Sequence, residues 1–145
     1  QDRRATPRFA HEAGALLLLF DLLYDIRQQI QQGRFYLPED EMRRFGVQPG
    51  DLMAAQTTDR VRQLFAFQAD RIRDYHRRAL AALPDRDRYV QCSLLIRMEL
   101  AMALLAEIAE DGYRLLEQRT SLPPLRKLWL AWRSRRRYRR GVVTV

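Results

Sequence analysis

The segment 92–113, which reads CSLLIRMELAMALLAEIAEDGY, is apolar on most sides of the helix that its spacing predicts. A helix with apolar side chains around most of its circumference has to be covered by other elements on several sides. Elsewhere in the chain, no run of alternating apolar and polar residues predicts a strand. The sequence therefore predicts an all-α fold, a helical bundle with this segment at its centre.

Cap and breaker residues divide the chain into further helices. Thr6 and Pro7 predict the start of a first helix, and Gly33 predicts its end. Thr57 or Thr58 can cap a later long helix. By residue number, the helices that we expect are 7–32, 38–45, 49–55, 58–83, 86–117 with its last turns loosened by Gly112, and a terminal helix after the SLPP segment. At 145 residues, the chain is long enough for one domain with its own core or for one half of a larger domain.

The positive charge of the chain is concentrated in a basic amphipathic tail, residues 126–145. The net charge is +8, yet this tail contains eight basic residues and no acid, so the other 18 basic residues balance the 18 acids. At its start, Leu125, Leu128, Trp129 and Trp132 follow the spacing of one helix face. Such a helix suits an anionic membrane surface. The alternatives are a helix whose tryptophans close the bundle and a nucleic-acid arm, although no groove-binding motif accompanies the charge.

Several classes of protein are excluded by what the chain lacks. One cysteine, Cys92, cannot form an internal disulfide, and with two histidines there is no Cys/His zinc constellation. The longest apolar run, 13–20, is shorter than the roughly 20 residues that a bilayer span needs, and no cleavage site follows it. We therefore expect a cytoplasmic protein that is soluble or peripheral at the inner face of the membrane.

Asp21 and Asp25 lie four residues apart in the first predicted helix, so they fall one turn apart on the same face. Two carboxylates at this spacing can share Mg²⁺, whose remaining ligands would be waters and substrate phosphates. Paired aspartates are also common on solvated helix surfaces, so the spacing alone does not decide between a metal site and an ordinary surface.

A series of motifs, in order along the chain, resembles the squalene/phytoene synthase family. They are GRFYLP directly after the acid-bearing helix, DEMRRFGV, LFAFQADRIRDYHRRALAALPDRDR and LLAEIAEDGYRLLEQRTSLPPLRKLWLAWR, and they cover about residues 7–137. Within the family, RTSLPPLRKLWLAWR is most similar to bacterial presqualene diphosphate synthases. The resemblance implies a helical bundle of the isoprenoid synthase type, of which residues 1–145 would form the C-terminal half.

The resemblance also implies an activity and a site. Such enzymes join two farnesyl diphosphates head to head, with Mg²⁺ clamped between two aspartate motifs on facing helices of an apolar cavity. By this resemblance Asp25 would hold the metal, and Arg34, Tyr36 and Arg119 would bind the isoprenyl diphosphate substrate. Asp21 stands where the family usually has an asparagine, and it could supply a second carboxylate one turn earlier. The residues expected to line the pocket are Gly14, Leu18, Leu22 and Gln29.

The chain departs from the family's pattern in three ways. When it is aligned on Gly33, Gln29 stands where a second acid is usual, and an amide adds no charge to hold Mg²⁺. In the central helix, Ala101 and Met102 stand where a tyrosine and an arginine are usual, and we expect both to be core residues. The first aspartate motif belongs to an N-terminal half that this chain does not contain, so residues 1–145 alone cannot complete a two-sided metal clamp.

Two hypotheses follow from this reading. In the first, the chain is part of a Mg²⁺-dependent farnesyl transferase that makes presqualene diphosphate and needs an N-terminal half, supplied by the rest of the protein or by a partner chain. In the second, it is an inactive family member that uses the fold for binding or assembly. The altered motif residues leave both open.

Overall fold

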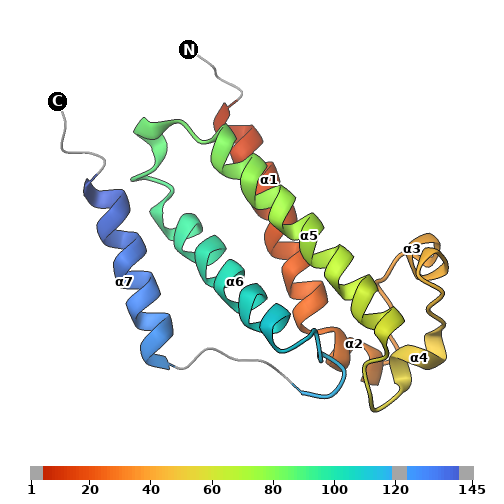
Figure 1. Cartoon of the computed structure of the whole chain (residues 1–145). Helices are drawn as coiled ribbons and strands as arrows, with labels where there is room; N and C mark the ends of the chain where they lie inside the picture. The colour runs from red at the N-terminus through yellow and green to blue at the C-terminus, as the bar shows by residue number, and fades with distance from the viewer. Residues whose placement is uncertain (1–4, 119–123, 141–145) are drawn as a thin grey trace.

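The computed structural model describes residues 5–118 and 124–140, and every regular element within these ranges is a helix (Figure 1). The all-α prediction is therefore confirmed for the described residues. In chain order, the elements are α1 (Ala5–Tyr24), α2 (Ile26–Gln31), α3 (Glu39–Arg44), α4 (Pro49–Met53), α5 (Asp59–Ala82), the 3-10 turn η1 (Asp85–Asp87), α6 (Cys92–Glu110) and α7 (Pro124–Arg140).

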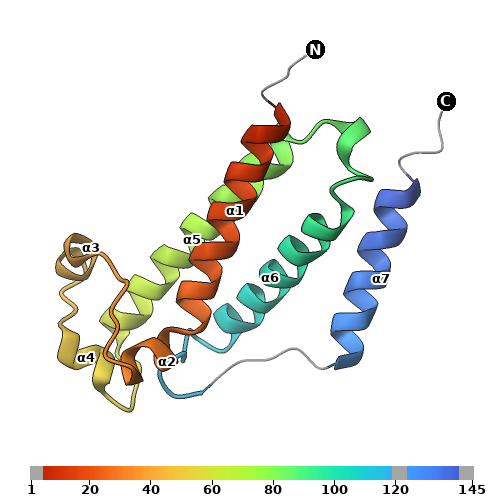
Figure 2. The same cartoon turned by 180° about the vertical axis from the view of Figure 1, so that it is seen from behind.

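The long helices α1 and α5 pack against each other along most of their length (Figures 1 and 2). On α1 the buried side chains recur every three or four residues, at Phe9, Ala13, Leu16, Phe20 and Leu23. The matching stripe on α5, fully buried, is Val61, Leu64, Phe65, Ala69 and Ile72. Because burial of apolar surface is the main force that stabilises folds, this contact is the centre of the core.

Helix α6 lies beside the α1–α5 pair, and α7 lies on the outer side of α6 (Figure 2). Leu95, Met98, Leu105 and Ile108 of α6 are buried, and Ala101 is only 4% exposed. This segment lies between α7 and the α1–α5 pair, and not at the centre of the core as predicted. Ala101 is a core residue as expected, whereas Met102 is half-buried against the core.

The predicted bounds hold well for three helices. Thr58 caps α5, since its Oγ1 accepts a hydrogen bond from the backbone N–H of Val61 at 3.4 Å. The helix ends at Ala82, next to the predicted end at Leu83. The two short helices expected over 38–45 and 49–55 are present as α3 and α4.

Two predicted helices are interrupted or shorter in the structure. The helix expected over 7–32 is divided at Asp25, although Asp25 N still donates to Asp21 O and Gln29 N to Asp25 O, both at 3.0 Å, so the break is a kink. The helix expected over 86–117 begins at Cys92 and ends at Glu110. Its end lies where Gly112 adopts φ +73°, a left-handed conformation that glycine allows and that stops a helix.

The prediction that Thr6 caps the first helix is wrong, because α1 already includes Ala5. Its hydroxyl instead donates to the Asp87 carboxylate at 2.6 Å. This contact fastens the start of α1 to η1, the turn that leads into α6.

The tail helix α7 presents its predicted apolar face to solvent. Leu125, Leu128, Trp129 and Trp132 are 51–80% exposed. The alternative in which the tryptophans close the bundle is therefore wrong for the described residues. Within 5–118 and 124–140, no helix has both the length and the hydrophobicity that a bilayer span requires.

We expect Leu16→Ala to lower the free energy of unfolding by about 3 kcal/mol, because it removes a fully buried side chain from the α1–α5 contact. The matched control is Leu18→Ala on the same helix, where Leu18 is 60% exposed and the change should cost less than about 0.5 kcal/mol. Urea unfolding followed by circular dichroism measures both. Equal losses would contradict the assignment of these two faces.

Candidate functional site

The kink at Asp25 keeps three predicted site positions in register. Asp21, Asp25 and Gln29 are joined by successive helical hydrogen bonds of 3.0 Å between backbone N–H and carbonyl groups. Their side chains therefore leave the helix one turn apart on neighbouring parts of its surface. The predicted spacing of the two acids is preserved across the break.

Gly33 ends α2 in a Schellman motif, which turns the chain toward the next predicted site residues. Its φ is +70°, Gly33 N donates to Ile30 O at 2.9 Å, and Arg34 N donates to Gln29 O at 2.8 Å. An added Cβ would meet no atom within 4 Å, so the glycine serves its backbone conformation and not a close contact. The motif fixes the backbone of Arg34 directly to that of Gln29.

Four of the predicted site residues surround one small cavity between α1–α2, the 34–38 segment, α4 and α5. They are Leu22, Gln29, Arg34 and Tyr36. The cavity measures about 80 Å³, enough for a few water molecules and well below the roughly 300 Å³ of small ligand pockets. This cavity is therefore too small to enclose a prenyl chain.

Two further polar residues of this cavity, Gln68 and Arg71 of α5, were not predicted as site residues. Both donate hydrogen bonds to the carboxylate of Glu41 on α3. The Arg71 guanidinium also lies 5.1 Å from the centre of the Phe67 ring. Gln68 is buried although it is polar. A glutamine within the apolar stripe of the predicted 58–83 helix was the sequence signal that this position makes a buried polar contact.

The two predicted metal residues do not line this cavity. Asp25 is half-buried and lines an open groove with Arg27, Gln28 and Leu115, whereas Asp21 is exposed. Gly14 and Leu18 are also exposed. Within residues 5–118 and 124–140, Gly14 and Leu18 do not line the cavity. Their place in a pocket stays a prediction, and it requires another element to cover α1.

The donor set in the described residues does not complete a magnesium site. No group of three or more histidine, cysteine, aspartate or glutamate residues is placed to hold a metal ion there. Mg²⁺ prefers six oxygen ligands in octahedral geometry, of which Asp21 and Asp25 can supply only part. Any Mg²⁺ at this face needs further ligands from substrate phosphates or from acids outside the described residues.

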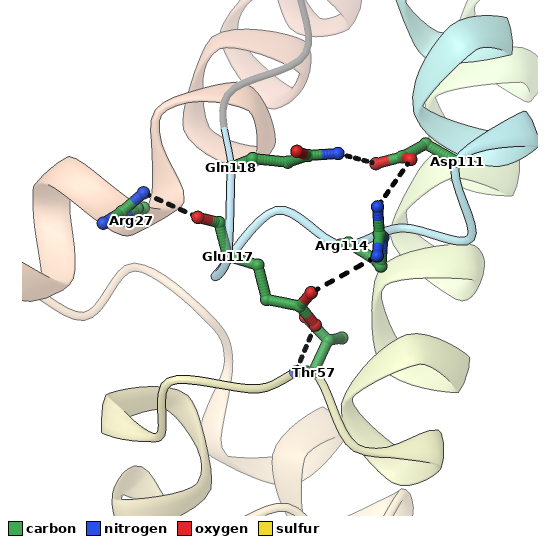
Figure 3. Close-up of polar contacts among 6 residues, drawn as sticks. All are labelled: Arg27, Thr57, Asp111, Arg114, Glu117 and Gln118. Atoms are coloured by element: carbon green, nitrogen blue, oxygen red, sulfur yellow. Dashed lines mark hydrogen bonds and ion pairs between the residues drawn. The ribbon is translucent and has the colours of Figure 1, made fainter.

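A polar network holds the segment that leads to Arg119, which itself lies outside the described residues (Figure 3). Glu117 accepts hydrogen bonds from Thr57 N at 3.0 Å on its side chain and from Arg27 Nη1 at 2.8 Å on its backbone carbonyl. Arg114 lies between Asp111 and Glu117, at 3.3 and 3.7 Å. The network ties this segment to α2 and to the start of α5.

Gln118 closes the network by donating to Asp111 at 3.0 Å. This hydrogen bond, helped by the charge of Arg114, holds the pKa of Asp111 below its ordinary value. A lowered carboxyl pKa contributes stability that is present above the ordinary aspartate pKa and is lost as the pH falls through the folded-state value. The hydrogen bond between Gln118 and Asp111 should therefore persist at neutral pH and weaken in acid.

Comparison with known proteins connects this arrangement with a family. The family model described as squalene/phytoene synthase matches residues 1–126. A phytoene synthase of Mycobacterium bovis is 32% identical over 130 residues, which is 88% of this chain and 43% of that protein. A 15-cis-phytoene synthase of Synechococcus elongatus is 29% identical over 110 residues, 76% of this chain and 36% of that protein. The chain thus spans less than half the length of these relatives.

We expect Glu117→Ala to speed amide exchange at Thr57 by roughly tenfold, because that buried N–H loses its carboxylate acceptor. Hydrogen exchange followed by NMR measures this change, and the amides of the α5 core should keep their rates. Glu110→Ala, which changes an exposed acid at the end of α6, is the control. An unchanged Thr57 rate would show that the network does not hold the segment.

Proposed function

This chain belongs to the squalene/phytoene synthase family, and on that premise we propose that it supplies one wall of the active site of an isoprenoid-condensing transferase. The observation that carries the proposal is the cavity at which Leu22, Gln29, Arg34 and Tyr36 meet Gln68 and Arg71. Two arginines and a tyrosine hydroxyl are suited to a diphosphate, because guanidinium groups bind phosphate oxygens through charge-assisted hydrogen bonds. The apolar neighbours of these groups suit a hydrocarbon chain.

The proposed substrate is farnesyl diphosphate, and the proposed reaction is its head-to-head condensation to presqualene diphosphate. One substrate loses diphosphate together with the electron pair of its C–O bond, and the pair of a double bond in the second substrate forms a first C–C bond to that carbon. A proton then leaves the same carbon, and the electron pair of its C–H bond forms a second C–C bond that closes the cyclopropane ring. Arg34 and Arg71 would stabilise the charge that develops on the leaving diphosphate, which is the usual contribution of such cations. The two relatives are named phytoene synthases, which supports the general class of prenyl transfer.

The proposal requires a second wall. A cavity of about 80 Å³ cannot hold a farnesyl group, and the side of α1 with Leu18 and Asp21 is exposed in the described residues. An element laid over this side would enclose Leu18 and bring acids opposite Asp21 and Asp25. We assign that element to the N-terminal half, in the same protein or in a partner chain. Mg²⁺ bound between the two walls would neutralise diphosphate charge.

The proposed location is the cytoplasm, with the protein peripheral at the inner face of the membrane. A condensation of this kind starts from a charged, water-soluble diphosphate and leads toward lipid-soluble isoprenoids. An enzyme at the membrane surface has access to both.

We expect this chain, combined with the N-terminal half from the same protein or from a partner and incubated with farnesyl diphosphate and Mg²⁺, to release diphosphate. Arg34→Ala should lower kcat/KM by roughly 100-fold, because it removes a cation from the leaving group. Arg43→Ala, which changes an exposed arginine of α3 away from the cavity, should leave the rate unchanged. A phosphate-release assay after pyrophosphatase measures all three, and absence of diphosphate release by the wild type would overturn the enzymatic proposal.

A second candidate function is an inactive family member that binds or assembles with a catalytic partner. Gln29 and Met102 at altered motif positions, and the incomplete donor set in the described residues, favour it. In that case the wild type should release no diphosphate, and Gln29→Asp, which restores the second acid of the motif, should increase Mg²⁺-dependent release. If the wild type turns over substrate and Gln29→Asp changes nothing, this candidate is wrong.

A further inference from the structure

Helix α7 exposes its apolar face to solvent, whereas a helix that covers a core buries that face. The apolar side chains of a surface helix normally face the interior. On α7, Leu125 is 80% exposed, Leu128 67%, Trp129 51% and Trp132 56%. We call these four residues the outer face of α7.

The side of α7 that meets α6 makes two ion pairs with it. Arg126 pairs with Glu107 of α6, and Arg137 pairs with Glu99 at 3.4 Å. Between these pairs lies the half-buried Leu130. The two ion pairs orient the helix so that the outer face points largely away from α6, and both views place α7 at the edge of the molecule, with α6 as its main neighbour (Figures 1 and 2).

The outer face is bordered by exposed basic residues. Arg133 lies over the Trp129 ring at 5.1 Å, and Arg136 lies over the Trp132 ring at 5.2 Å. Lys127 and Arg135 are exposed as well, and the sequence of α7 contains no acid. Tryptophan beside arginine is the combination that suits a lipid headgroup layer, where one side of the surroundings is apolar and the other is hydrated and anionic.

We propose that α7 docks on an anionic lipid bilayer, with Leu125, Leu128, Trp129 and Trp132 in the interface and the bordering arginines on lipid phosphates. A second copy of the chain fits less well, because two such faces would bring like charges together. A nucleic acid would engage the arginines and leave the leucines in water. The bilayer is the partner that matches both the apolar face and its charge.

The chain carries its own probe for this surface, because Trp129 and Trp132 are its only tryptophans. We expect their fluorescence to shift to the blue, and to become protected from acrylamide, when the full chain is mixed with vesicles of phosphatidylcholine and phosphatidylglycerol. Pure phosphatidylcholine vesicles should bind at least about tenfold less protein in a flotation assay, because each basic residue near an anionic surface contributes roughly fivefold. Single Trp→Phe variants resolve the two positions.

Matched variants separate burial from charge. Leu125→Ala combined with Leu128→Ala removes apolar area from exposed positions, and should weaken vesicle binding about tenfold without changing the thermal midpoint. Arg135→Gln combined with Arg136→Gln should weaken binding to anionic vesicles by a similar factor. The controls are Leu18→Ala, an exposed leucine on α1, and Arg43→Gln combined with Arg60→Gln, exposed arginines elsewhere.

Three outcomes would overturn the proposal. The first is no binding to anionic vesicles, and the second is binding that the leucine variant does not weaken. The third is a fluorescence shift that appears without lipid as the protein concentration rises, which would indicate self-association through this face. Binding of duplex DNA that depends on the arginines alone, without lipid binding, would assign the tail to nucleic acid. None of these measurements uses an isoprenyl diphosphate, so the result is independent of the enzymatic proposal.

Discussion

The packing of α1 against α5 positions everything else in this fold. The inner side of α1, from Phe9 to Leu23, is fixed on α5 by burial, so the outer side of the same helix has to carry Asp21, and the kink that follows has to carry Asp25. On α5, the same contact sets the depth of Gln68, which Glu41 of α3 then engages. Both components of the candidate site are therefore consequences of one hydrophobic contact.

Periodicity and caps were sufficient to predict most of this architecture. The bounds of α5 could be predicted because a threonine cap and a proline shortly after its end are local signals. The kink at Asp25 could not, because neither proline nor glycine marks it. The orientation of α7 could not be predicted either, because Arg126 and Arg137 pair with two acids of α6 that lie far from them in the chain. Amphipathicity identified the apolar face of α7 but could not say which way it would point.

Some residues of the candidate site could likewise be predicted from the sequence, and others could not. Arg34 and Tyr36 were predictable because they belong to a short motif that follows a helix stop, and the structure brings both to one cavity with Gln29. The place of Arg71 in this cavity was not predictable, because it depends on the contact between α3 and α5. Asp21 and Asp25 keep the predicted spacing, yet neither lines the cavity. Sequence spacing fixes relations within one helix, whereas a site is made of relations between helices.

The attachment of α7 differs in kind from the rest of the fold. The α1–α5 contact is held by buried apolar surface, which salt does not screen. The contact between α7 and α6 includes two ion pairs whose arginines are about half exposed, and such pairs are weak and become weaker as salt shortens the range of charge. The position of α7 on the bundle should therefore depend on ionic strength, whereas the α1–α5 packing should not.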